Sequence, residues 1–152
     1  MSDYTSKIES VPLLKGLSDG IRNNASLILD AISDECTMAK GETLYREGED
    51  GDNTGSILIT GSVEVTHGDS EPMIVKAPDI LGEMQQLNDT GQRLATVRIH
   101  EPATVLTFSW HNFVGLIMTS GRVPKDQQDE LREAMNASGV SRVQQLFDQH
   151  NA

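Results

Sequence analysis

The chain has 152 residues, 37% of them hydrophobic and only 4% aromatic, and carries a formal net charge of −11. This length suits one domain with a sizeable core, which must be built mainly from Leu, Ile, Val and Met. Proteins that bind nucleic acid directly gather Lys and Arg on one surface. Because the 12 basic residues here are scattered among 23 acidic ones, we expect no direct nucleic-acid contact.

Neither a targeting segment nor a metal site is expected. The first thirty residues lack an apolar run long enough for a secretory signal, and no later window approaches a membrane span. The single cysteine, Cys36, excludes an internal disulfide, and the four histidines show no metal-ligand spacing. The sequence therefore indicates a cytoplasmic protein with no membrane segment, no bound metal and no cofactor.

The N-terminal segment, residues 1–35, is predicted to be helical. From Ser18 to Ile32 the apolar residues recur with a loosely helical period. Ser18 precedes the first periodic residue and belongs to the residue types that favour helix starts, so it is the expected N-cap.

Residues 36–110 show a shorter pattern that tends toward alternation and is interrupted by glycines. Six strands are predicted, at Thr43–Tyr45, Ser56–Ile59, Ser62–Thr66, Met73–Lys76, Thr96–Ile99 and Thr104–Phe108. Many short strands joined by glycine turns are typical of a barrel or jelly roll. We therefore expect a mainly β domain, a β-roll of the jelly-roll type, flanked by α-helices.

Residues 111–152 return to a helical pattern and are predicted to form two helices. Phe113, Leu116 and Ile117 share one face of the first helix. Pro124 opens the second, whose first turns are acidic, as the helix dipole favours. Its apolar stripe covers either the roll or a partner subunit. All three segments are expected to belong to a single domain.

The candidate functional chemistry lies in residues 80–95. A Gly-Glu pair ends an apolar run there, and an arginine precedes the next strand. Free N–H groups at the start of a short helix bind anions, and a guanidinium has the charge and forked donors that suit a phosphate. A carboxylate can accept from sugar hydroxyls, so the pair suits a sugar phosphate. The ligand-binding residues that we expect are Leu81, Gly82, Glu83, Met84, Arg93, Leu94 and Ala95.

This segment resembles the phosphate-binding cassette of the cyclic nucleotide-binding domain family. In that family, Gly-Glu is followed nine or ten positions later by an arginine with small residues beside it. Glu83 and Arg93 are ten positions apart and Ala95 closes the motif, a spacing similar to that of the bacterial catabolite-activator branch. The resemblance implies that Arg93 binds the cyclic phosphate and that Glu83 binds the ribose 2′-hydroxyl.

The resemblance covers most of the chain. Residues 11–19 are similar to the family's first helical segment, residues 40–48 to its first strand and turn, and residues 61–65 to its central hairpin. The sequence stops about where the family's transcription factors begin a helix-turn-helix domain, and we expect none here.

Several positions depart from the family pattern. Leu94 stands where a small or hydroxylated side chain is usual, Pro78 where glycine is usual, and Gly55-Ser56 where an apolar and aromatic pair is usual. In cyclic-GMP-selective members of the family, a hydroxyl beside the cassette arginine reaches the guanine amino group. Since Leu94 has no hydroxyl, the resemblance implies a preference for cyclic AMP.

Two interpretations of function follow. In the first, the domain is a cyclic AMP sensor in which phosphate capture shifts the C-terminal helices and changes a homodimer or partner contact. In the second, the nucleotide site is degenerate and the domain is an interaction or dimerisation module. Arg93 is then an ordinary surface or ion-paired arginine, and Glu83 caps the helix that follows it, a role that can coexist with ligand binding. Neither interpretation predicts an enzyme, because the sequence shows no nucleophile, metal-ligand set or paired acids.

Overall fold

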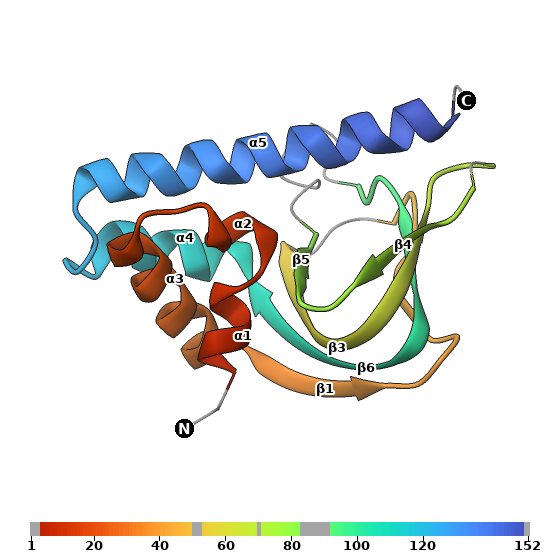
Figure 1. Ribbon diagram of the computed structural model, residues 1–152, viewed down its shortest axis with the longest axis horizontal. Coiled ribbons are helices and arrows are strands. Elements are labelled where there is room, and N and C mark those ends of the chain that lie inside the picture. The colour runs from red at the N-terminus through yellow and green to blue at the C-terminus, as the bar shows by residue number, and fades with distance from the viewer. Residues whose placement is uncertain (1–3, 50–52, 70, 83–91, 151–152) are drawn as a thin grey trace.

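The computed structural model describes residues 4–49, 53–69, 71–82 and 92–150, with side chains described as far as residue 137. Helices α1–α4 gather at one end of the molecule, the strands form the other end, and α5 extends along both (Figure 1). The elements are α1 (Thr5–Glu9), α2 (Pro12–Lys15), α3 (Asp19–Ile32), β1 (Asp34–Met38), β2 (Thr43–Tyr45), β3 (Thr54–Thr66), β4 (Met73–Lys76), β5 (Asp79–Leu81), β6 (Thr96–Ser109), α4 (Trp110–Thr119) and α5 (Lys125–His150).

The described strands form one antiparallel sheet in which β3 and β6 are central. The strand order is β1-β6-β3-β4, while β2 also pairs with β6 and β5 with β3. The sheet bends into a roll but does not close (Figure 1). The predicted mainly β, jelly-roll fold with flanking helices is therefore confirmed, with an open sheet in place of a closed barrel. Strands β2 and β4 have the bounds predicted from the sequence.

The other predicted strands are halves of two long ones. Residues 56–59 and 62–66 both belong to β3, which passes Gly61 without turning back. The β3–β6 register shifts at this point, Gly61 has a φ of +88°, and a Cβ there would lie 2.4 Å from the carbonyl oxygen of Pro102. The glycine therefore forms an irregularity of the bulge type within a continuous strand.

The sequence pattern does not predict β1 or β5. In β1 four of the five residues are exposed, so no alternation of apolar residues marks the strand; pairing with β6 defines it, with Cys36 opposite Val105. Strand β5 has three residues, all buried, and follows a cis peptide bond before Pro78. Both strands are specified by the neighbours they pair with rather than by local propensity.

The sheet separates two hydrophobic cores, because alternate residues of a strand point to opposite faces. Ile57 and Ile59 of β3 face the helices, whereas Leu58 and Val63 face the inside of the roll. The helical core also contains Leu13, Leu14, Ile21, Leu29, Ile80, Leu106, Phe108, Trp110, Phe113, Ile117 and Leu131. The roll core also contains Tyr45, Val65, Val75, Leu81, Ala95, Val97, Ile99, Ala103 and Val105.

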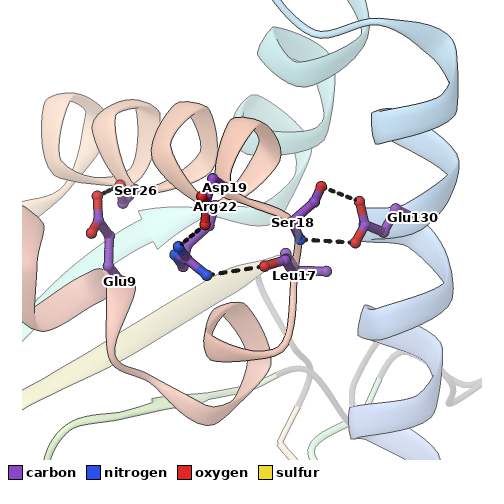
Figure 2. A network of polar contacts seen from close by, with 7 residues as sticks. All are labelled: Glu9, Leu17, Ser18, Asp19, Arg22, Ser26 and Glu130. Atoms are coloured by element: carbon purple, nitrogen blue, oxygen red, sulfur yellow. Dashed lines mark hydrogen bonds and ion pairs between the residues drawn. The ribbon is translucent and has the colours of Figure 1, made fainter.

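The structure adds detail to two expectations about the helices. Ser18 occupies the N-cap position of α3, but its side chain makes no capping hydrogen bond there; it donates to Glu130 of α5 instead (Figure 2). In α4, Phe113 and Ile117 of the predicted shared face are buried, whereas Leu116 is 39% exposed. It lies at the edge of the face that the other two residues share, where the helix meets solvent.

The second C-terminal helix is present as α5, directly after Pro124. Leu131 is buried in the helical core, and Met135 packs against it. The N-terminal part of α5 therefore packs against the helices α2 and α3. The later positions of the predicted apolar stripe, from residue 138 onward, lie outside the described side chains.

Candidate functional site

Arg93 lies just before β6 and is held by its backbone against the turn after β2. Its N–H donates to the carbonyl of Glu49 at 2.8 Å, and its own carbonyl accepts from the N–H of Gly48 at 2.9 Å. The residue is only 7% exposed, and its Nη2 donates to the carbonyl of Thr54 on β3 at 3.0 Å. A charged side chain is thus fixed between two strands.

Tyr45 of β2 lies beneath the guanidinium of Arg93. The guanidinium carbon is 3.8 Å from the centroid of the tyrosine ring, the geometry of a cation–π interaction. The tyrosine hydroxyl lies 2.5 Å from Oγ of Ser56 and 3.5 Å from the carbonyl of Thr54. Since the N–H groups of a guanidinium lie in its plane, stacking on the ring occupies the face and leaves the edges directed elsewhere.

Gly82, at the other end of the cassette in the sequence, lies close to the same polar atoms. Its φ is +96°, a conformation that favours glycine. A Cβ on Gly82 would lie 3.1 Å from the carbonyl oxygen of Thr54, 3.2 Å from Oη of Tyr45 and 3.3 Å from Nη1 of Arg93. The absence of a side chain therefore allows polar atoms of Thr54, Tyr45 and Arg93 to approach the backbone of Gly82 closely. Gly82 and Arg93, predicted as site residues from the sequence, are in this way brought together.

A cavity of about 240 Å³ adjoins Arg93. Among the described residues its lining consists of Leu44, Tyr45, Arg46, Glu49, Thr54, Ser56, Arg93 and Thr107. The lining offers two arginines, one of them buried, and four hydroxyl-bearing side chains, together with one carboxylate, that of Glu49. This combination suits an anionic group that accepts hydrogen bonds, such as a phosphate.

The remaining predicted site residues have different surroundings. Leu81 and Ala95 are both 3% exposed and belong to the roll core, where they flank the site. Leu94 is half-buried, and it is absent from the described lining of the cavity. Glu83 and Met84 lie outside the described residues.

His67, which follows β3, fixes the backbone beside Arg93. Its Nδ1 lies 2.8 Å from the carbonyl oxygen of Leu94 and 3.7 Å from Oε1 of Glu47. The same Glu47 carboxylate oxygen accepts from the N–H of Gly68 at 2.8 Å. The turn after β2, the end of β3 and the end of the cassette are therefore joined at one point.

The other polar residues that line the cavity were not identified from the sequence: Tyr45, Arg46, Glu49, Thr54, Ser56 and Thr107. The available signal was the replacement of an apolar and aromatic pair by Gly55-Ser56. Ser56 is fully buried although polar, and its small side chain leaves room for the tyrosine hydroxyl from β2. The aromatic ring therefore comes from a neighbouring segment rather than from β3 itself.

No helix in the described part of the chain is sufficiently long and apolar to cross a membrane. Among the same residues, no three His, Cys, Asp or Glu side chains come together in a way that would hold a metal ion.

The fold is an open β-roll flanked by helices, with a buried arginine beside a cavity. The sequence profile of the family described as the cyclic nucleotide-binding domain matches residues 35–120, which is more than half of the chain. The protein therefore belongs to the cyclic nucleotide-binding domain family. No curated protein matches the chain significantly.

Solved structures share the fold over nearly the whole chain. The sensor domain of the transcriptional regulator DNR from Pseudomonas aeruginosa is 20% identical, with a TM-score of 0.69 over 96% of this chain and 92% of that one. The N-terminal domain of a transcriptional regulator from Streptomyces coelicolor A3(2) is 23% identical, with a TM-score of 0.59 over 93% and 92%. PfPKA-R in a cAMP-bound structure is 21% identical, with a TM-score of 0.62 over 90% of this chain and 46% of that one.

Proposed function

We propose that this domain is a sensor, not an enzyme, that binds a cyclic nucleotide, and that cyclic AMP is the preferred ligand. The observation that carries the proposal is the buried guanidinium of Arg93, which lines a cavity of about 240 Å³ and lies close to the backbone of Gly82. These residues stand on either side of the segment predicted to bind a sugar phosphate. Membership of the family defines the ligand class, and the cAMP-bound structure of the same fold supports the choice of nucleotide.

In this proposal Arg93 binds the cyclic phosphate and Glu83 accepts from the ribose 2′-hydroxyl. Leu81 and Ala95 support the site from the roll core, and Met84 and Leu94 border the ligand. The net charge of −11 opposes an anion at long range, so affinity must come from short-range donors. Arg93 suits this role because a charge that is mostly shielded from water interacts more strongly than an exposed one.

We further propose that binding is transmitted to α5 through α2. Strand β5 ends at Leu81, beside Gly82, and α2 contacts both β5 and α5. Ile80 of β5 and Leu131 of α5 belong to the same helical core. A shift of Gly82 upon phosphate binding would thereby change the packing of α5 against α2. This change would in turn alter a contact to a second subunit or a regulated partner.

One observation favours the alternative function, an interaction or dimerisation module that binds no nucleotide. The guanidinium of Arg93 is already engaged by the carbonyl of Thr54 and the ring of Tyr45. A phosphate must therefore add to these contacts or displace them.

Calorimetric titration with cyclic AMP and cyclic GMP tests the proposal. Arg93→Ala should abolish measurable binding, because truncating one partner of a buried, hydrogen-bonded charge pair costs roughly 2–5 kcal/mol. Arg98→Ala is the matched control, since it removes the same charge from an exposed position on β6 and should leave affinity nearly unchanged. If the wild-type chain gives neither heat nor a thermal shift with millimolar cyclic nucleotide, the module without nucleotide replaces the sensor.

A further inference from the structure

Tyr45 lies outside the cassette motif but contacts its arginine, Arg93. We propose that Tyr45 is a positioning residue for Arg93: its ring sets the plane of the guanidinium so that the Nη1 edge lies close to the backbone of Gly82, where the predicted cassette begins. The ligand in this inference rests on the function proposed above. The orientation of the side chain rests on contacts that exist without the ligand.

Two contacts restrict the guanidinium in different directions. The ring of Tyr45, 3.8 Å from the guanidinium carbon, restricts tilting of the plane. The hydrogen bond from Nη2 to the carbonyl of Thr54 restricts rotation within the plane. With both in place, the second terminal nitrogen, Nη1, lies 3.3 Å from where a Cβ of Gly82 would be.

Tyr45 is itself held in place, as a residue that orients another must be. It is 9% exposed, and its hydroxyl is hydrogen-bonded to Ser56, which is fully buried. Its backbone pairs with Val97 at the start of β6, a few residues beyond Arg93. Ring and guanidinium are therefore carried by two segments that are already joined by backbone hydrogen bonds.

An aliphatic residue at position 45 could fill the roll core but could not attract a cation. A cation–π interaction is electrostatic and grows stronger when both groups are shielded from water, as they are here. Replacing the ring with a non-aromatic side chain should therefore weaken cyclic AMP binding by about 10-fold. Tyr45→Phe keeps the ring and loses only the hydroxyl, so it should hold Arg93 as wild type does and lose less affinity than the non-aromatic variants.

The test compares wild type, Tyr45→Phe, Tyr45→Met and Tyr45→Leu in two measurements. NMR order parameters of the Arg93 Nε–Hε group report how firmly the side chain is held without ligand, and calorimetry with cyclic AMP reports affinity. Two non-aromatic variants are used so that a failure of one to fold leaves the comparison intact. The expected result is a rigid Arg93 and strong binding in wild type and Tyr45→Phe, with a mobile Arg93 and weaker binding in the folded non-aromatic variants.

Equal rigidity of Arg93 in all folded variants would overturn the inference, as would a loss of affinity in Tyr45→Phe as large as that in Tyr45→Met. A loss of that size in Tyr45→Phe would mean that the hydroxyl of Tyr45, rather than its ring, contributes to ligand binding. If wild type binds no cyclic nucleotide, the proposed function fails, whereas the NMR comparison still decides whether Tyr45 positions Arg93.

Discussion

Glu130 of α5 accepts two hydrogen bonds from Ser18 at the start of α3, one from its backbone N–H at 3.0 Å and one from its hydroxyl at 2.7 Å (Figure 2). In a capping box, a Glu three residues after the N-cap accepts from the N-cap backbone N–H. That position in α3 is Ile21, which cannot accept. Glu130, 112 residues away along the chain, takes this role and attaches α5 to the N-terminal helices.

The Ser18–Glu130 contact predicts a pH-dependent contribution to stability. The hydrogen bonds from the Ser18 side chain and backbone lower the pKa of the Glu130 carboxyl below its ordinary value of 4.5. Because the folded state favours the carboxylate, the contribution is fully present above this value and is lost as pH falls through the folded-state pKa. Glu130→Ala should therefore lower the midpoint of urea denaturation at pH 7, and the difference from wild type should shrink at pH 3.

Glu133→Ala, an exposed change on the same helix, is the control for the loss of one negative charge. A Glu130→Ala effect that is the same at both pH values, or that Glu133→Ala reproduces, would contradict the assignment.

Gly82→Ala should damage both stability and binding. A non-glycine residue in the left-handed region costs about 1–2 kcal/mol, and the new methyl would crowd Tyr45, Thr54 and Arg93. Gly115→Ala in α4 is the control, because a Cβ there has no neighbour within 4 Å and alanine stabilises a helix interior by about 0.5–1 kcal/mol. Urea denaturation and cyclic AMP titration measure the two effects, and a Gly82→Ala chain that matches wild type in both would remove Gly82 from the site.

Leu94→Ser should tighten cyclic nucleotide binding if the leucine crowds the phosphate. One added donor to a charged oxygen contributes roughly 1.5–3 kcal/mol, offset in part by lost apolar packing, since Leu94 is half-buried. Leu94→Ala separates relief of crowding from the new hydroxyl. If Leu94→Ser leaves the affinity unchanged while Arg93→Ala destroys it, the Leu94 side chain points away from the phosphate.

Competition between the two cyclic nucleotides tests ligand preference. We expect a modest preference for cyclic AMP, because Leu94 lacks the hydroxyl that would reach the guanine amino group. Displacement of a labelled cyclic AMP by each unlabelled nucleotide gives the ratio of affinities directly. Tighter binding of cyclic GMP would refute the role assigned to position 94.

The sequence predicts those parts of the molecule that local patterns specify. The period of α3, the bounds of β2 and β4 and the spacing of Gly82 and Arg93 all depend on residues close together in the chain. Partners that are distant in sequence were not predicted. The exposed strand β1 exists because β6 pairs with it, and Ser18 bonds to α5 rather than to its own helix.

The same distinction applies to the site. The cassette motif identifies Arg93, but what fixes the guanidinium is a ring from β2 and a carbonyl from β3. Both are brought there by the way that the sheet bends. Tyr45 read alone is an ordinary aromatic strand residue, and the carbonyl of Thr54 has no signature in the sequence at all.

Strands β3 and β6 have a hydrophobic surface on each face. Ile57 and Phe108 belong to the core shared with the helices, whereas Leu58 and Val105 belong to the core of the roll. Removing the helices would therefore expose the hydrophobic face of these strands that packs against them. A fragment trimmed to the matched residues 35–120 would therefore expose a broad apolar surface and associate or aggregate. The unit that can be expressed, crystallised or joined to another protein as a sensor is the roll together with the helices on both sides of it in the sequence.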